Sequence, residues 1–304
     1  MYSYFDAHCD TMSKMYKRGL GLDCSELMVN TNNLSDYRES VQVFALFNGG
    51  KMRRADMDAC FAYFKGECER LNDKVRICRT AEDIEKNKAP LSAVLSIEGL
   101  GNQPDFKLTD IGDFHREGVR FMSLSWNNDN VLCGGCDGDG GLTELGRAAL
   151  AEMERYRIIL DVSHMSDKSF YESLENYNLP LVATHSLSRA VHNHRRNLTD
   201  GQFLEIMRQG GVVGINFYPP FLTDGKADID TVLSHIEHFM SLGGENSLGL
   251  GSDFDGIDAA PQGLECSAHF YRLANRLLAL NYREDTVEKI MHKNFKKLLK
   301  HFNM

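Results

Sequence analysis

The chain of 304 residues is predicted to fold as an α/β protein, a (β/α)8 TIM barrel whose functional site lies at the carboxyl ends of the strands. Eight runs of apolar, β-branched residues recur along it, stretches of helical periodicity separate them, and residue types that bind metals end several runs. Strands that alternate with helices pair in parallel, so eight such units favour a closed barrel over the competing architecture, an open doubly wound sheet.

The expected strands are short and continuously apolar, as burial on both faces requires. In order, they cover residues 2–8, 41–48, 92–98, 118–126, 158–164, 181–186, 211–218 and 247–253. Helical periodicity is clearest at 143–157, 166–177, 199–210 and 228–244. The segments 12–40 and 50–91 lengthen the first two units, and the polar tail at about 282–304 is predicted to form a closing helix. We therefore expect residues 1–304 to form a single domain.

Composition limits the class of partner. The formal net charge of −9 argues against a nucleic-acid or anionic-membrane surface, because such partners require a face rich in lysine and arginine. A small-molecule substrate is expected instead. The chain shows no signal-peptide pattern and no apolar span of about 18 residues, which predicts a cytoplasmic protein without a membrane segment. A homodimer is an open alternative to a monomer, since an isologous patch leaves no motif.

The first candidate metal ligands are His8 and Asp10, at the end of the first run. Positions i and i+2 of a strand face the same side, so both side chains can reach one ion while Cys9 points into the helix layer. An isolated H-x-D is weak, and a strand-end histidine held by a carbonyl is the competing interpretation.

Glu98 ends an otherwise apolar strand, where an unpaired carboxylate is costly to bury, so it needs a cation. Its two oxygens make it the natural bridge if the site holds two ions, and a buried pair with an arginine is the alternative. His164 and His185 end consecutive strands and lie side by side in a barrel. Neutral imidazoles suit Zn²⁺, although Mn²⁺ or Co²⁺ could occupy the same ligands.

Several other polar residues lie near these strand ends. Asp253 ends the last apolar run and could accept a proton, whereas Asp255, beside Gly256, is interpreted as a loop cap. One arginine of the loop after His185 could turn inward to hold a substrate carboxylate. Cys133 and Cys136 form an isolated C-x-x-C, which we interpret as reduced loop cysteines. The other histidines, at 115, 235, 238, 269, 292 and 301, are expected at the surface.

The order of these motifs resembles the membrane (renal) dipeptidase family, peptidase family M19, among the amidohydrolase-like barrels. The similarity runs from DAHCDT near the start into the C-terminal helix. Its most specific pieces are D-x-x-H-x-S at 161–166, the H-S…R-R-N block at 185–197, N-F-Y at 216–218 and G-x-D-F-D-G at 251–256.

The resemblance implies roles for individual residues. His8 and Asp10 would bind one zinc ion, His164 and His185 a second, and Glu98 would bridge both. Asp253 would carry protons during catalysis. The substrate-binding residues would be Arg196, which would hold the substrate's carboxylate, with Trp126, Tyr218 and Phe221.

Two positions depart from the mammalian members of the family. Trp126 stands where those members carry a substrate-polarising histidine, and it donates only through its indole N–H. Phe221 replaces a tyrosine that lines their carboxylate pocket. Both changes leave the metal ligands intact but put substrate preference and turnover in question.

The predicted function is zinc-dependent hydrolysis of dipeptides through a water or hydroxide shared by two ions, with Asp253 and Glu98 at the catalytic centre. Two alternatives stay open. The same metals could serve hydrolysis of another small amide, such as an N-acyl amino acid, a β-lactam or a cyclic amide. A barrel with a degenerate site could instead act as a binding protein, an alternative that Trp126 raises.

Overall fold

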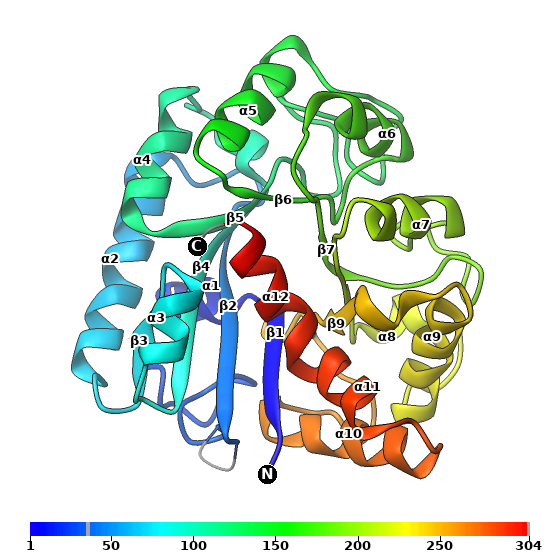
Figure 1. Cartoon of the computed structure of the whole chain (residues 1–304). Coiled ribbons are helices and arrows are strands. Elements are labelled where there is room, and N and C mark those ends of the chain that lie inside the picture. Colours follow the sequence, from blue (N-terminus) through cyan, green and yellow to red (C-terminus); the bar gives the residue numbers. More distant parts are fainter. Residues whose placement is uncertain (35–36, 303–304) are drawn as a thin grey trace.

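The computed structural model describes residues 1–34 and 37–302 and consists of a ring of parallel strands surrounded by helices (Figure 1). Its strands are β1 Ser3–Cys9, β2 Glu39–Phe47, β3 Val75–Ile77, β4 Leu91–Glu98, β5 Val119–Ser123, β6 Ile159–Asp161, β7 Ala183–Ser186, β8 Val213–Ile215 and β9 Leu248–Leu250. Its α-helices are α1 Thr11–Arg18, α2 Arg54–Arg70, α3 Ala81–Lys86, α4 Thr109–Glu117, α5 Glu144–Arg155, α6 Asp167–Asn176, α7 Asp200–Arg208, α8 Pro219–Leu222, α9 Ile229–Ser241, α10 Phe270–Ala279, α11 Glu284–Glu288 and α12 Asn294–His301. Short 3-10 turns lie at Leu100–Asn102, Gly244–Asn246 and Ser267–His269.

The strands close into a barrel. Hydrogen-bonded neighbours follow the order β6-β5-β4-β2-β1-β9-β8-β7. The two ends of this series meet through a single parallel bridge, in which the N–H of Val162 donates to the carbonyl of Val182 at 2.7 Å. The predicted (β/α)8 barrel is therefore confirmed, with its weakest seam between β6 and β7.

The sequence prediction missed strand β3. It pairs with the first half of β4, from Val75 opposite Leu91, while β5 pairs with the second half of the same strand. Because β2 follows β4 along its whole length, β3 and β5 share the other edge. β3 has only three residues and includes the exposed Arg76, so it carries too little apolar pattern to be recognised.

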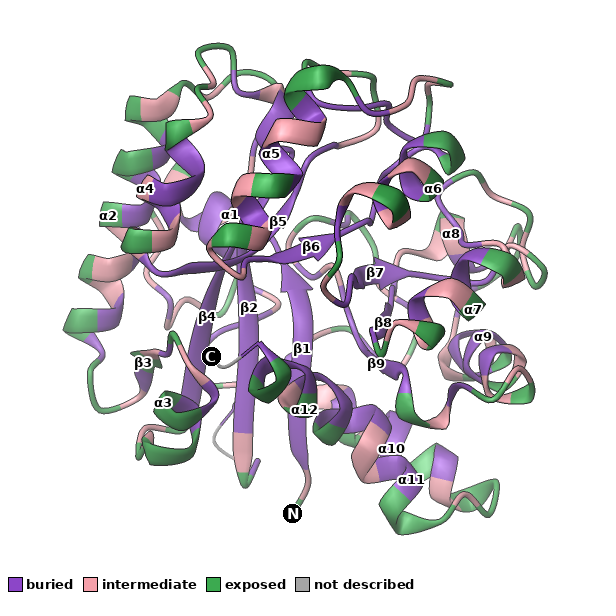
Figure 2. Ribbon diagram, turned by 45° about the horizontal axis from the view of Figure 1, so that its top comes forward, coloured by how far each residue is buried: buried purple, intermediate pink, exposed green. Residues whose placement is uncertain are grey.

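The four helices with the clearest periodicity, α5, α6, α7 and α9, lie within the ranges predicted for them. Three of them begin at hydroxyl caps: Thr143 accepts from the N–H of Gly146, Ser166 from that of Ser169, and Thr199 from that of Gln202. These helices bury one face against the strands and leave the other exposed (Figure 2).

The C-terminal helix α12 packs across the end of the barrel opposite the candidate ligands. Phe295 of α12 stacks on Phe5 of β1, with ring centroids 5.3 Å apart. A Cβ at Gly249 of β9 would lie 2.4 Å from the Phe295 ring, so this close approach requires glycine. The side chain of Asn294 adds hydrogen bonds to the carbonyls of Glu245 and Leu248, at 3.0 and 2.8 Å.

The predicted closing helix at about 282–304 is not one continuous α-helix. A π-helical segment, Lys289–Lys293, separates α11 from α12. It adjoins Asn294, whose bonds to Glu245 and to Leu248, the first residue of β9, hold this part of the tail against the barrel. Residues 303–304 lie outside the described residues. No helix of the described ranges is both long and apolar enough to cross a bilayer.

A cluster of ion pairs connects this tail to the barrel. Its contribution to the free energy of unfolding is expected to disappear at acid pH. Glu39 of β2 lies 2.6 Å from Nζ of Lys296 and 3.3 Å from Nε2 of His292. Burial raises the pKa of Glu39, but the two partners outweigh it and lower that pKa to about 2. A carboxyl group with a lowered folded-state pKa stabilises the fold above its unfolded pKa and loses this contribution as the pH falls through the folded value.

Glu39→Gln is therefore expected to lower the free energy of unfolding by about 1 kcal/mol near pH 6, a modest value because the pair is partly exposed. The difference from the wild type should shrink between about pH 4.5 and pH 2, as measured by denaturant unfolding at each pH. Glu82→Gln is the control, because Glu82 pairs with Lys86 on the open surface. A difference that stays constant down to pH 2 would contradict the assignment.

Candidate metal centre and substrate cavity

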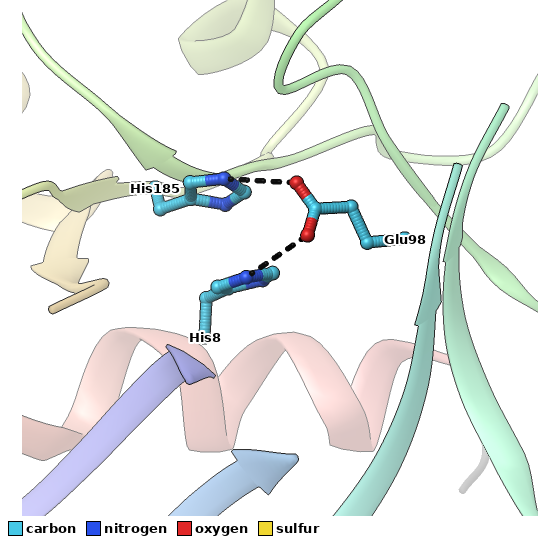
Figure 3. Close-up of side chains that lie close together, drawn as sticks. All are labelled: His8, Glu98 and His185. Carbon is cyan, nitrogen blue, oxygen red and sulfur yellow. Dashed lines mark ion pairs between the residues drawn. The ribbon is translucent and has the colours of Figure 1, made fainter. Parts of the chain in front are cut away.

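Four distant segments bring the candidate ligands His8, Asp10, His164 and His185 together around the carboxylate of Glu98, the last residue of β4. Figure 3 shows three of these side chains, His8, Glu98 and His185. Nε2 of His8 lies 3.5 Å from its Oε2. On the other side, Nε2 of His164 lies 2.9 Å and Nε2 of His185 3.6 Å from its Oε1. Glu98 thus turns one oxygen toward each of the two predicted ligand groups.

The first group combines His8 with Asp10. Nε2 of His8 lies 3.7 Å from Oδ2 of Asp10, and both residues are buried. A register shift between Asp6 and Cys9 interrupts the pairing of β1 with β2, and Cys9 packs among the residues of the helix layer, as predicted. Nε2 of His8 and Oδ1 of Asp10 have no hydrogen-bond partner in the described part of the chain.

The second group is held by hydrogen bonds that define its tautomers. The hydroxyl of Thr184 donates its one hydrogen to Oδ2 of Asp161 at 2.5 Å, so at 2.8 Å it can only accept from Nδ1 of His185. Nδ1 of His164 lies 2.7 Å from the amide oxygen of Asn127, which also accepts. Both imidazoles therefore carry their proton on Nδ1 and present a bare lone pair at Nε2.

This donor set fits a bound cation. The Nε2 atoms of His164 and His185 lie 3.0 Å apart, and both face Oε1 of Glu98. With both imidazole protons on Nδ1, no proton lies between these three atoms, so their lone pairs repel one another unless a cation is bound. Together with the unpartnered atoms of His8 and Asp10, the arrangement has the chemistry of an imidazole and carboxylate metal site. Three donor atoms, from His8, Glu98 and His185, lie within 4.8 Å of one another.

Burial and neighbouring charges together shift the pKa values of the buried groups in this centre. Burial raises the pKa of Glu98, but His8 and the other imidazoles outweigh it and hold that pKa well below its usual range. Burial lowers the pKa of His8, yet Glu98 and Asp10 hold it well above its usual value. Burial, then the charge of Arg196, lowers the pKa of His164 to about 4.

His164 and Asp253 do not end strands, contrary to the prediction. β6 ends at Asp161 and β9 at Leu250, and each site residue follows three residues later with a positive φ, 69° at His164 and 64° at Asp253. Left-handed backbone is unfavourable for residues with a side chain and tends to concentrate at functional sites. The turn aims each side chain at the mouth of the barrel.

Asp253 lies at the edge of the candidate metal centre and lines the adjoining cavity. Asn216 donates to its Oδ2 at 3.0 Å, while its Oδ1 lies 3.8 Å from Nε2 of His8. Burial, with the charges of Asp10 and Glu98, outweighs His8 and raises the pKa of Asp253 to about 7. The sequence analysis did not single out Asn216, although it opens the N-F-Y motif.

Asp255 has the structural role expected of it. It accepts from the hydroxyl of Thr11 at 2.6 Å, from Nζ of Lys14 at 2.8 Å and from the N–H of Met28 at 3.0 Å. These bonds hold α1 against the loop after β9. A Cβ at Gly256 would lie 2.1 Å from Oδ2 of Asp10, so this glycine leaves room for the ligand.

A cavity of about 460 Å³ opens beside Glu98 and Asp253. Three predicted substrate-binding residues line it: Trp126, Tyr218 and Phe221. Phe47 packs edge-on against Trp126, with ring centroids 5.1 Å apart. The cavity also has a basic wall from α1, formed by Lys14, Lys17 and Arg18. This wall was not predicted, because basic residues on one face of a short surface helix form no recognisable motif.

Arg196 turns inward, whereas its neighbour Arg195 pairs with Asp139 at the surface. The guanidinium of Arg196 donates to Oγ of Ser186 at 2.9 Å and to the carbonyl of His185 at 2.8 Å. Arg196 does not line the 460 Å³ cavity, but its buried Nε–H has no acceptor among the described residues. One donor of the fork is therefore unused.

The loop cysteines and the remaining histidines lie outside the candidate centre. Cys133 and Cys136 are buried free thiols, and burial raises the pKa of Cys133 to about 12. The expectation that the remaining histidines lie at the surface is wrong for two of them. His235 is fully buried, where its Nδ1 accepts from the N–H of Ser188, and His292 is buried beside Glu39.

A model of the membrane dipeptidase family, peptidase family M19, matches residues 2–303. The chain belongs to this family. The predicted family is therefore confirmed. Membership also confirms the predicted class of enzyme, a metal-dependent hydrolase that acts on peptide bonds.

Solved structures of this family share the whole fold. A crystal structure of dipeptidase AC, a metallopeptidase of family M19, is 26% identical, has a TM-score of 0.89 and covers 98% of each chain. A metallopeptidase from Rhodobacter sphaeroides, bound to a phosphinate mimic of the dipeptide L-Ala-D-Ala, is 25% identical with a TM-score of 0.89, covering 98% of this chain and 99% of its own.

Relatives by sequence include an uncharacterised Klebsiella pneumoniae protein, 37% identical over 75% of this chain and 89% of its own length. An uncharacterised dipeptidase of Schizosaccharomyces pombe is 35% identical over 64% of this chain. The dipeptidase TcpJ of Claviceps purpurea is 30% identical over 76% of it. The match spans only 50% and 56% of these two fungal proteins.

Proposed function

We propose that residues 1–304 act as one zinc-dependent dipeptidase domain with two ions per chain. His8 and Asp10 would hold one ion, His164 and His185 the other, and Glu98 would bridge them. The observation that carries this proposal is the unprotonated Nε2 atoms of His164 and His185, which lie 3.0 Å apart and face the buried carboxylate of Glu98. Bound ions would supply an activated water nucleophile and a Lewis acid for the peptide carbonyl.

Asp253 is the residue of this chain that moves protons. Asn216 occupies its Oδ2, so Oδ1 is free to accept a proton from the attacking water and to return it to the leaving amine. Its position on the cavity wall beside Glu98 supports this role. The three aromatic residues Trp126, Tyr218 and Phe221 line the cavity above the centre and would contact the substrate there.

Arg196 is proposed to bind the carboxylate of the substrate. Its unused Nε–H supports this role, because a buried donor without an acceptor costs free energy that a carboxylate would recover. A site that recognises this terminus favours dipeptides over long chains. The dipeptide mimic bound by the Rhodobacter sphaeroides relative supports the same class of substrate, including a D-residue at the C-terminal position.

The test is hydrolysis of a dipeptide panel that varies the side chains and the stereochemistry of both residues. Protein reconstituted with zinc is expected to release free amino acids from dipeptides, and chelation followed by zinc addition is expected to abolish and then restore this activity. N-acyl amino acids, a β-lactam and a tripeptide complete the panel. Turnover of those amides with no dipeptide cleavage would refute the proposal.

A further inference from the structure

The basic wall of the cavity comes from one face of α1. Lys14, Lys17 and Arg18 all line the cavity that also contains Glu98 and Asp253. Residues one turn apart on a helix point the same way, so these cations form a continuous edge beside the candidate catalytic centre. In a chain with a net charge of −9, three cations at one rim form a distinct local feature.

Two of these cations already have carboxylate partners. Nζ of Lys14 lies 2.8 Å from Oδ1 of Asp255, whose carboxylate is fully buried. The guanidinium of Arg18 lies 2.7 Å from Glu26. Lys17 forms no ion pair with any carboxylate in residues 1–34 and 37–302, and its Nζ lies 5.3 Å from the ring centroid of Phe47. Lys17 is therefore the cation of this wall that is available to a ligand.

The surroundings favour a carboxylate as that ligand. The aromatic neighbour of Lys17 is Phe47, which packs edge-on against Trp126. The Phe47 side chain has no hydrogen-bond acceptor and attracts a cation only weakly, through its ring face. The long, flexible stem of Lys17 lets its ammonium group follow a mobile side chain. Arg196, the proposed partner of the substrate's main-chain carboxylate, is buried away from this wall, so Lys17 is left for a second negative charge.

We propose that Lys17 is a specificity-determining residue that favours dipeptides with an acidic side chain. The proposal rests on the proposed dipeptidase function and names a substrate class for it. Because Lys17 is exposed, the gain is that of a solvent-accessible ion pair, a two- to fivefold preference in kcat/KM of roughly the size such pairs give. The preference should fall at high ionic strength, since salt screens exposed charges.

The experiment compares isosteric substrates that differ in one charge: Asp-Ala with Asn-Ala, and Ala-Asp with Ala-Asn. For the zinc-reconstituted wild type, the ratio of kcat/KM, acidic to neutral, is expected to exceed about two in at least one pair. Lys17→Gln should bring that ratio to about one, Lys17→Glu below one, and Lys17→Arg should preserve it. Arg18→Gln is the matched control, since Arg18 already has Glu26 as its partner, and it should retain the wild-type ratio.

A wild-type ratio near one in both pairs, or a ratio that Lys17→Gln does not change, would overturn the inference while leaving the dipeptidase function in place. A total absence of hydrolysis would instead overturn the proposed function. In that case, calorimetry measures the dissociation constants of uncleavable phosphinate analogues of the same four dipeptides. The ratio of affinities, acidic to neutral, is then compared between the zinc-loaded wild type and Lys17→Gln. Equal ratios in the two proteins would again refute the role of Lys17.

Discussion

Asp253→Asn is expected to lower kcat for dipeptide hydrolysis by about 10²- to 10⁴-fold, the usual contribution of a positioned general acid–base group. The substitution keeps the size of the side chain, and its amide oxygen can still accept the hydrogen bond from Asn216. The amide cannot take a proton from water or return one to an amine. The loss should therefore appear in kcat, with a small change in KM.

Steady-state kinetics and the zinc content of the same sample together test this role. Asp253 also lies close to His8 and Asp10, in a group of three residues that could hold an ion. If Asp253→Asn loses zinc in proportion to activity, Asp253 is a ligand and not the proton carrier. A kcat within threefold of the wild type would contradict both roles. Asn216→Ala adds a graded comparison, because it frees the second oxygen of Asp253 without removing the carboxylate.

Thr184→Val is expected to weaken zinc binding by about 10- to 100-fold, the range seen when partners of metal ligands are removed. The Thr184 hydroxyl links the buried Asp161 to Nδ1 of His185 and so keeps the proton off Nε2. Valine fills the same volume but leaves the Nδ1–H of His185 and an oxygen of Asp161 without this partner. The affinity should fall because the ring is no longer held in its metal-binding tautomer.

Competition with a chelator of known affinity measures this effect independently of catalysis. Thr184→Ser is the control that retains the hydroxyl, and it should bind zinc within a few-fold of the wild type. Thermal unfolding of the metal-free proteins separates loss of affinity from loss of fold. An unchanged zinc affinity in Thr184→Val would mean that Thr184 does not orient the ligand.

The meeting of the candidate ligands was predictable because parallel strands of a barrel bring their carboxyl ends, and the residues that follow them, to one rim. Glu98 illustrates this: a lone carboxylate after an apolar run has few stable solutions besides a cation. β3 was not predictable, because three residues with a charged centre carry no periodicity. The positive φ of His164 and Asp253 was not predictable from the residue types. Histidine and aspartate adopt left-handed backbone more often than most residues do, but still too rarely to mark one position in a chain.

The residues that support the ligands were harder to find. Asn127 and Thr184 reach the imidazoles only because of the paths of the loop after β5 and the end of β7, and a hydroxyl or amide is too common along a chain to stand out. Lys17 stands out from its neighbours because it has no carboxylate partner within the described ranges. Asp255 pairs with Lys14 and Glu26 with Arg18, and these pairings are visible only in the folded structure.

Anomalous diffraction at the zinc edge from crystals of the zinc-loaded protein tests the central claim most directly. The account predicts two peaks per chain, one between His8, Asp10 and Glu98 and the other between His164, His185 and Glu98, with the carboxylate of Glu98 contacting both. A single peak, or two peaks away from Glu98, would contradict the binuclear centre.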